Sequence, residues 1–373
     1  MKIKRIEPIA VSLPMRKPVH MAGVEIRQAD NILLRMESDT GIVGWGEAAS
    51  APTMTGETVE SMMAAVHYLA PAVVGRQAED IAGTVTAMAS RMYGNSGAKA
   101  AIEIALHDLV GRATGEPVHA LLGGRKRDRI ALLSVISSGE LAGDLRDAEK
   151  KKAEGFRAFK IKVGIDKPLI DGDRTRKVCE LLGSGLLICS DANQGWSTDE
   201  ALQYAGAVKG SGLDFFEQPV LADDLAGMAK VAAAADCAIG ADESIHSLDD
   251  IRRHHERKAA RGVSLKCIKL GGMRGVMAAG RLCEELGMSV NVSCKTGESS
   301  ISCAAGIHIA SALPQIAWGL TITNEGLSDD TSAQPIRSAG GHVTVSDRPG
   351  LGIEVDEDRV RRYRRDVPVR QVA

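Results

Sequence analysis

The sequence predicts an α/β protein built on a parallel β/α barrel, and three observations support this fold class. Eight short apolar runs alternate with longer amphipathic segments between about residues 130 and 320, and the pattern repeats about every 25 residues. Such alternation is typical of a barrel in which each strand is followed by a helix. The absence of a glycine-rich phosphate-binding fingerprint disfavours an open, doubly wound sheet. Only 3% of the 373 residues are aromatic, which suits the branched aliphatic interior of a barrel.

The apolar runs that we expect to form the barrel strands are 130–137, 159–163, 186–191, 213–219, 237–242, 263–270, 288–294 and 316–320. Helical spacing covers segments between them, such as 198–208, 248–259 and 273–286. Trp318, at the last run, is expected to belong to the barrel core. The barrel domain is therefore predicted over residues 126–320.

A smaller α+β unit is predicted before the barrel. Residues 2–13 and 31–37 have strand character, and 42–47 follow across the turn signal Asp39-Thr40-Gly41, which indicates a hairpin. Helical spacing then covers 58–69, 80–91 and 97–114. We expect this unit to form an N-terminal domain over residues 1–125, and the C-terminal segment 321–373 to return and pack on it.

Charge and cysteine content exclude several classes of protein. The net charge is −2, without the basic footprint of a nucleic-acid-binding protein. The sequence contains no stretch of 18 apolar residues, so no transmembrane helix is expected. The N-terminus lacks the apolar region of a signal peptide. The seven cysteines form no C-x-x-C motif, which favours reduced thiols over disulfides or a zinc site. We expect a cytoplasmic protein that binds neither nucleic acid nor membranes.

Three predicted strands end in a carboxylate, and these are Asp191, Glu217 and Asp242. Their spacings of 26 and 25 residues correspond to one β/α unit each. Side chains at the C-terminal ends of barrel strands converge on one site, where three carboxylates repel one another unless a cation lies between them. Oxygen ligands without a neighbouring His or Cys favour Mg²⁺, with Mn²⁺ as an alternative.

Lysines flank the predicted carboxylate cluster. Lys160 and Lys162 are two residues apart, so both side chains lie on one face of their strand. Lys266 comes from the sixth strand, across the barrel, and a lysine beside a divalent cation and a second ammonium group has the lowered pKa of a general base. Lys269 follows Lys266 by three residues, so the two side chains would lie on opposite faces of the predicted strand. Parity does not decide which of the two points inward, and a position facing the helices is expected for Lys269.

As an ordered set, the motifs resemble the muconate lactonizing enzyme subgroup of the enolase superfamily over nearly the whole chain. They are Lys160-Ile161-Lys162, Asp191-Ala192-Asn193, Glu217-Gln218-Pro219, Asp242-Glu243-Ser244, Leu265-Lys266 followed by Gly271-Gly272, and Gly44-Trp45-Gly46-Glu47. The resemblance implies a modified (β/α)₇β barrel with an α+β capping domain. It implies that Asp191, Glu217 and Asp242 hold Mg²⁺. It also implies that Lys162 and Lys266 face each other across the substrate, with Lys160 supporting Lys162.

The resemblance implies abstraction of the proton α to a carboxylate, which gives an enediolate. The second lysine would return a proton on the other face or assist loss of a β leaving group. The first expectation is racemisation, epimerisation or dehydration of a small amino-acid or imino-acid derivative, such as a hydroxyproline-type acid. Muconate-type cycloisomerisation is the alternative, and a non-catalytic binding protein on the same fold is a remote one.

The candidates for substrate contacts are less sharply defined. They are Asn193, Lys295, Glu298, Thr321, Thr323, His20 and Thr53. Glu298 matches an acid that the subgroup carries after its seventh strand. Dipeptide epimerases resembling this subgroup carry Asp-x-Asp where this chain has Thr321 and Thr323, which argues against that activity. Lys295 either binds a substrate carboxylate or lies on the surface. The expected partners are a small carboxylate substrate and further copies of the chain.

Overall fold

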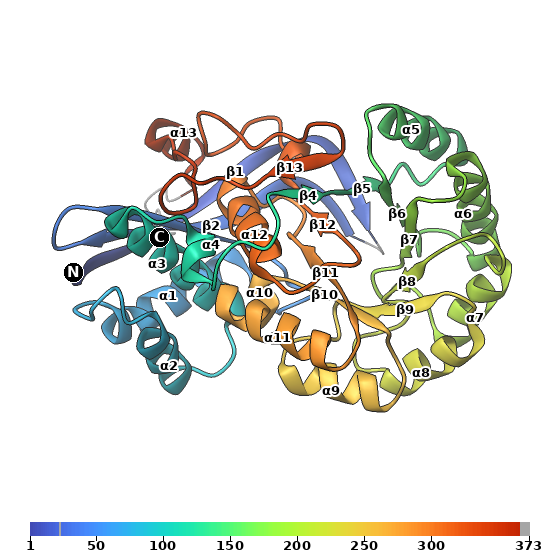
Figure 1. The fold of residues 1–373 in the computed structure, drawn as a ribbon, viewed down its shortest axis with the longest axis horizontal. Coiled ribbons are helices and arrows are strands. Elements are labelled where there is room, and N and C mark those ends of the chain that lie inside the picture. The colour runs from blue at the N-terminus through green and yellow to red at the C-terminus, as the bar shows by residue number, and fades with distance from the viewer. Residues whose placement is uncertain (22–23, 366–373) are drawn as a thin grey trace, which may run out of the picture.

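The computed structural model describes residues 1–21 and 24–365, and its main feature is a ring of parallel strands surrounded by helices (Figure 1). Eight strands follow one another in the sheet in the order β12-β11-β10-β9-β8-β7-β6-β5. A parallel bridge between Leu132 and Leu320 joins the two edges of this sheet. The predicted eight-stranded barrel is thereby confirmed.

The barrel strands are β5 (Leu133–Ile136), β6 (Ala158–Lys162), β7 (Leu187–Asp191), β8 (Phe215–Glu217), β9 (Ala238–Ala241), β10 (Gly262–Leu265), β11 (Ser289–Ser293) and β12 (Leu320–Thr321). The helices after the first seven strands are α5 (Leu141–Ala153), α6 (Pro168–Leu182), α7 (Thr198–Ala207), α8 (Leu225–Ala234), α9 (Leu248–Glu256), α10 (Cys267–Leu270) with α11 (Met273–Glu285), and α12 (Ser300–Ala312). This order matches the modified (β/α)₇β barrel.

Two predicted strand runs contain more than one element. In run 263–270, β10 ends at Leu265 and the chain turns into the short helix α10. Run 130–137 is divided between β4 (Arg129–Ala131), which pairs with β13 (His342–Thr344), and the barrel strand β5. Both runs are mainly apolar, and segments of three or four residues are too short to show a helical or a strand period.

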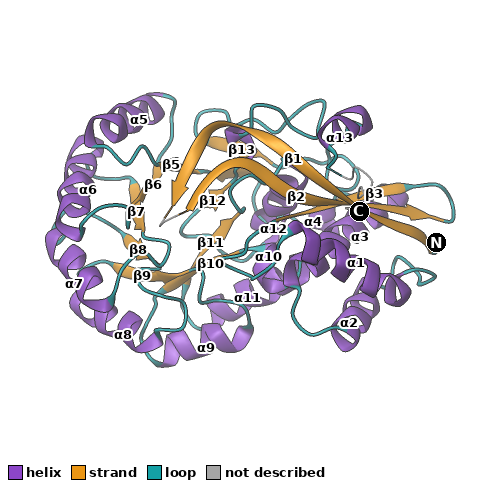
Figure 2. Cartoon of the chain, turned by 180° about the vertical axis from the view of Figure 1, so that it is seen from behind, coloured by secondary structure: helices purple, strands orange, loops and turns teal. Residues whose placement is uncertain are grey.

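The N-terminal unit is a three-stranded antiparallel sheet with helices on it. Its strands are β1 (Ile3–Met21), β2 (Val24–Ser38) and β3 (Val43–Ala49), and its helices are α1 (Val59–Val73), α2 (Ile81–Arg91), α3 (Ser96–Thr114) and α4 (Val118–Leu121). The predicted hairpin across residues 39–41 is confirmed by the antiparallel pairing of β2 with β3. Strands β1 and β2 are longer than predicted, and Figure 2 shows them curving across the barrel as a two-stranded arm.

Glycines in β3 let helix α3 approach the sheet closely. A Cβ atom on Gly44 would overlap the backbone of Ala105, and one on Gly46 would overlap the backbone of Ala101. The next residue of the motif, Glu47, reaches the barrel domain, where its carboxylate accepts a hydrogen bond of 2.8 Å from Ser299 Oγ at the start of α12. The motif Gly44-Trp45-Gly46-Glu47 thus joins α3, β3 and α12.

The C-terminal segment runs back along the N-terminal unit. It contains α13 (Glu357–Tyr363), after which Arg364 forms an antiparallel bridge with Val11 of β1. The domain boundaries at residues 125 and 320 stay predictions. Across residues 1–21 and 24–365, no helix combines the length and the apolar character needed to cross a membrane.

An aromatic pair fills the interior of the barrel. The Trp318 indole stacks on the Phe215 ring with centroids 3.9 Å apart and planes 5° apart, and it packs in one cluster with Leu133, Ala158 and Cys189. The expected place of Trp318 in the core is confirmed. Gly262 of β10 makes room for the indole, because a Cβ atom there would overlap it.

Candidate active site

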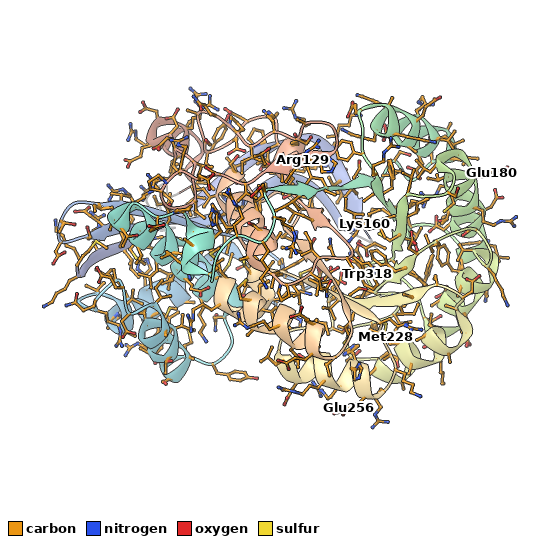
Figure 3. All side chains as sticks on the ribbon, viewed as in Figure 1. Arg129, Lys160, Glu180, Met228, Glu256 and Trp318 are labelled. Atoms are coloured by element: carbon orange, nitrogen blue, oxygen red, sulfur yellow. The ribbon has the colours of Figure 1, made fainter. Side chains whose placement is uncertain are left out.

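A cavity of about 1390 Å³ lies at the C-terminal ends of the barrel strands, beneath the β1–β2 arm. Lys160, Lys162 and Lys266 line its inner wall, and residues 15–19 of β1 line the side formed by the arm. In Figure 3, Lys160 lies inside the ring of strands, whereas Glu180 and Glu256 lie on the outer helices. This end of the barrel is where β/α barrel enzymes carry their active sites.

The three predicted carboxylates come from three adjacent strands. Asp191 of β7 pairs in register with Glu217 of β8, and Glu217 pairs with Gly240 of β9. Asp242 follows Gly240 by two residues, so its side chain comes from the same end of the barrel. Each acid is at most 1% exposed. Buried carboxylates need compensating positive charge, and the lysines provide it.

The two lysines of β6 point into the carboxylate cluster, as their spacing predicts. Lys160 Nζ lies 2.7 and 2.8 Å from the two carboxylate oxygens of Glu217 and 3.5 Å from Asp191 Oδ2. Lys162 Nζ donates hydrogen bonds of 2.6 Å to Asp191 Oδ2 and to Asn193 Oδ1. Asn193 in turn donates through Nδ2 to Glu243 Oε1 at 3.0 Å. The site is therefore one connected polar network.

The prediction that Lys269 faces the helices is wrong. Lys266 Nζ hydrogen-bonds to Asp242 Oδ2, and Lys269 Nζ donates to Asp242 Oδ1 at 2.6 Å and to Ser264 O at 3.0 Å. The chain leaves the extended conformation after Lys266 and forms α10. Because residues three apart lie on the same side of a helical turn, both lysines point to Asp242, and strand alternation does not apply to this pair.

The paired charges shift the pKa values of the site. Burial opposes ionisation of Asp242, but the Lys266 and Lys269 ammonium groups lower its pKa well below the ordinary value. Burial raises the pKa of Glu217 even though Lys160 lowers it. Burial alone would lower the pKa of Lys266, yet Asp242 and Glu243 raise it above its ordinary value. The lowered pKa expected for Lys266 beside a divalent cation stays a prediction.

The donor set of the three carboxylates suits a hard divalent cation such as Mg²⁺. The three acids are close enough to repel one another, because Asp191 and Asp242 both raise the pKa of Glu217. In the chain as described, no three His, Cys, Asp or Glu side chains converge as ligands of one ion. Ammonium groups lie against the carboxylate oxygens instead, and Lys160 lies between Glu217 and Asp191.

Two functional neighbours of the cluster were not among the predicted site residues. Gln218 is fully buried, and its Oε1 accepts hydrogen bonds from Asp242 N at 2.9 Å and from Ser244 Oγ at 2.9 Å, which fixes the loop after β9. Glu243 lines the cavity, and its Oε2 has no hydrogen-bond partner within residues 1–21 and 24–365. Burial, together with repulsion from Asp242 and Asp191, raises its pKa to about 7. Both stand inside the sequence motifs, but nothing in the sequence shows that their side chains turn toward the site.

Lys295 and Glu298 lie in the loop after β11. Lys295 lines the cavity and is 9% exposed, so it is not a surface lysine. Its backbone N donates to Glu298 Oε2 at 2.9 Å, and its carbonyl accepts from Thr323 Oγ1 at 2.8 Å. Burial lowers the pKa of Lys295 to about 8 and raises that of Glu298 to about 8.

The remaining candidates differ in their surroundings. Thr321 is buried in the cavity wall with its hydroxyl unpartnered among the described groups. Thr323 lines the cavity too, but its hydroxyl is occupied by the bond to Lys295 O. Thr53, from the capping unit, is exposed and lines the outer part of the cavity. The side chain of His20 lies outside the part of the chain that the structure describes.

Both parts of the chain match known protein families. Residues 5–123 match the N-terminal domain of the mandelate racemase / muconate lactonizing enzyme family, and residues 144–359 match the enolase C-terminal domain-like family. A chloromuconate cycloisomerase of Cupriavidus pinatubonensis is 32% identical over 95% of this chain and 96% of that protein. An L-Ala-D/L-Glu epimerase of Clostridium acetobutylicum is 33% identical over 95% of this chain and 99% of that protein.

Solved structures of the same family superpose closely. The muconate lactonizing enzyme from Pseudomonas fluorescens complexed with muconolactone has a TM-score of 0.93 and 30% identity, covering 98% of this chain and 99% of that one. The N-succinyl Arg/Lys racemase from Bacillus cereus has a TM-score of 0.92 and 30% identity, covering 98% of both chains. These relatives are isomerases, and enolase-superfamily enzymes typically use Mg²⁺. The chain is an enzyme of the enolase superfamily and belongs to its mandelate racemase / muconate lactonizing enzyme family.

Proposed function

We propose that this enzyme removes the proton α to the carboxylate of a small amino-acid or imino-acid derivative. The observation that carries the proposal is the placement of Lys162 and Lys266. They line one cavity from β6 and from the end of β10, which are four strands apart in a ring of eight. A substrate between them is open to a base on one face and an acid on the other.

Lys162 and Lys266 each carry out one of the two proton transfers. One of the two lysines, in its neutral form, takes the proton, and the other, as an ammonium group, delivers one to the opposite face. Lys162 is held in place by Asp191 and Asn193, and Lys266 by Asp242. Fixed donors and acceptors of this kind lower the cost of reorganisation during the reaction. Lys160, bonded to Glu217, keeps positive charge beside Lys162.

Asp191, Glu217 and Asp242 are the residues that would hold Mg²⁺. A bound Mg²⁺ would offset their charge and supply positive charge to stabilise an enediolate. The same first step leads to racemisation or epimerisation when the proton is returned, or to dehydration when the substrate carries a β-hydroxyl group. Thr321 and Thr323 offer no charge to a free amino group, which favours derivatives over unmodified dipeptides. We also propose a homo-oligomer as the assembled form.

The reaction is tested by following α-proton exchange in ²H₂O by NMR with a panel of amino-acid and imino-acid derivatives. Lys162→Ala and Lys266→Ala should each abolish racemisation, because return of a proton on the opposite face needs both lysines. Each variant should still exchange the α proton of one enantiomer through the lysine that remains. Exposed Lys177, ion-paired with Asp173 on the outer surface, gives the control Lys177→Ala, which should behave as wild type. Full turnover by either active-site variant would exclude the mechanism.

Cycloisomerisation of a muconate is the second candidate. It is favoured by the similarity to the chloromuconate cycloisomerase and to the structure complexed with muconolactone. Ring closure consumes the conjugated diene of muconate, so its absorbance would fall on addition of enzyme. A fall that depends on Lys266, without exchange of any amino-acid derivative, would favour this second reaction over the first.

A further inference from the structure

Lys295 is a buried cation that has no partner among the residues that the structure describes. Its side chain is 9% exposed and lines the active-site cavity. Its ammonium group forms neither a hydrogen bond nor an ion pair within the described parts of the chain, in contrast to Lys160, Lys162, Lys266 and Lys269. A buried ammonium group costs free energy unless it is paired, so a lysine left open in a cavity indicates that a ligand supplies its partner.

The backbone of Lys295 is fixed from two sides. Glu298 Oε2 accepts from its N–H at 2.9 Å, and Thr323 Oγ1 donates to its carbonyl at 2.8 Å. The side chain therefore starts from a defined point in the wall of the cavity. A preorganised group of this kind binds a ligand at a smaller entropic cost than a mobile one.

Four charged groups surround the ammonium group. Lys266 and Lys162 lie near enough to lower its pKa, and Glu298 and Glu243 lie near enough to raise it. Neither acid forms an ion pair with the Lys295 ammonium group among the residues that the structure describes, and burial raises the pKa of Glu298 to about 8. Two lysines thus lie near an ammonium group that has no ion-pair partner among the described residues, and an anionic ligand group would supply the missing negative charge.

We infer that Lys295 binds a second anionic group of the substrate, a carboxylate remote from the carbon that loses its proton. The substrate class is then a dianion, for example an amino acid whose N-acyl group ends in a carboxylate. A cavity of about 1390 Å³ has room for such a molecule, since most ligand pockets measure about 300–1,000 Å³. The inference rests on the proposed function for the identity of the reacting carbon, but binding itself does not need turnover.

The test compares two ligands that differ in one group. N-succinyl-L-alanine ends in a carboxylate, and N-butanoyl-L-alanine has a methyl group in its place. Isothermal titration calorimetry in buffer with Mg²⁺ should show that the wild-type enzyme binds the dianion at least about tenfold more tightly, as expected for a charge-assisted hydrogen bond. In Lys295→Met, which keeps the length of the side chain, this preference should fall below about threefold.

The control variant is Lys151→Gln, which removes a positive charge at the outer margin of the same cavity. The Lys151 ammonium group is already paired with Glu154 at 2.8 Å, so the preference for the dianion should change by less than about twofold. Circular dichroism spectra and unfolding curves of each variant would show that the fold is retained.

Two results would overturn the inference. The first is a wild-type enzyme that shows no preference for the dianion. The second is a Lys295→Met variant that keeps the preference for the dianion, or that loses the same affinity for both ligands. An equal loss is expected if Lys295 forms an ion pair with Glu243 and does not contact the ligand. Exchange of α protons is recorded on the same samples. A preference that depends on Lys295 without exchange would refute the proposed reaction but not this inference. Exchange without any preference that depends on Lys295 would refute this inference but not the proposed reaction.

Discussion

At the scale of single residues, Lys295 and Glu298 carry charges that change near neutral pH. Burial lowers the pKa of Lys295 to about 8 and raises that of Glu298 to about 8. Below this pH, Lys295 is an ammonium group and Glu298 is neutral. Above it, Lys295 loses its charge and Glu298 becomes a carboxylate, so this part of the cavity changes from positive to negative as the pH rises. Lys162, Lys266 and Glu243 are the other charged groups near the Lys295 ammonium.

The affinity for a dianionic ligand should therefore fall as the pH rises through about 8, because the positive group is lost and a negative group appears beside it. Titration calorimetry with N-succinyl-L-alanine between about pH 6.5 and pH 9.5 measures this change. The methyl analogue should show a much smaller loss. Lys295→Met should remove most of the pH dependence, and a profile unchanged in that variant would assign the titration to other groups.

The sequence predicts the positions of the site's acids but not the orientation of every lysine. The positions of Asp191, Glu217 and Asp242 follow from the period of the β/α unit, and they do lie together on adjacent strands. The orientation of Lys269 was missed because it depends on a change from strand to helix, and the helix is only four residues long. The sequence likewise left the place of Lys295 open, since one lysine in a loop has no period.

At the scale of elements, Glu47 connects the capping unit to a barrel helix. The carboxylate at the end of its side chain is fully buried and accepts hydrogen bonds from Ser299 N, Ser299 Oγ and Ser302 N at the start of α12, and from Asn31 Nδ2 of β2. The first turn of a helix has free N–H groups that need such acceptors. A strand of one unit therefore caps a helix of the other, which fixes the capping unit above the barrel.

Glu47→Ala should lower the free energy of unfolding by about 3 kcal/mol, because it leaves several buried donors without an acceptor. Urea unfolding followed by circular dichroism measures the loss. The control is Glu37→Ala on the same sheet, which removes partly exposed ion pairs with Lys4 and Arg35 and should lower the free energy of unfolding much less, because exposed ion pairs contribute little to stability. Equal losses in the two variants would show that Glu47 has no special role between the units.

At the scale of the whole molecule, closure of the barrel brings the two lysines to opposite walls of one cavity. Strand β6 and strand β10 are separated by three strands in either direction around the ring. Residues 15–19 of the β1–β2 arm line one side of the cavity, and Figure 2 shows the arm curving across the barrel. Substrate access and substrate choice therefore depend on both units, whereas the acid–base groups come from the barrel alone.

Binding of Mg²⁺ at the three carboxylates should stabilise the entire fold, because the site does not exist in the unfolded chain. At about 100 times the dissociation constant, the gain is about 2.7 kcal/mol. Thermal unfolding of chelator-treated protein with and without Mg²⁺ should show a rise of several degrees in Tm. Asp242→Asn should abolish most of that rise. Exposed Asp173, paired with Lys177, gives the control Asp173→Asn, which should retain it.

The sequence by itself determined the barrel, the order of the motifs and the strand ends at which the acids and lysines stand. These features follow from local patterns, because apolar periods and the length of a β/α unit are properties of consecutive residues. Only the tertiary structure decided that Lys269 shares Asp242 with Lys266, that Glu47 caps α12, and that Lys295 is buried with no partner in the described part of the chain. Each of these depends on side chains that meet across elements far apart in the chain, and such contacts leave no period in the sequence.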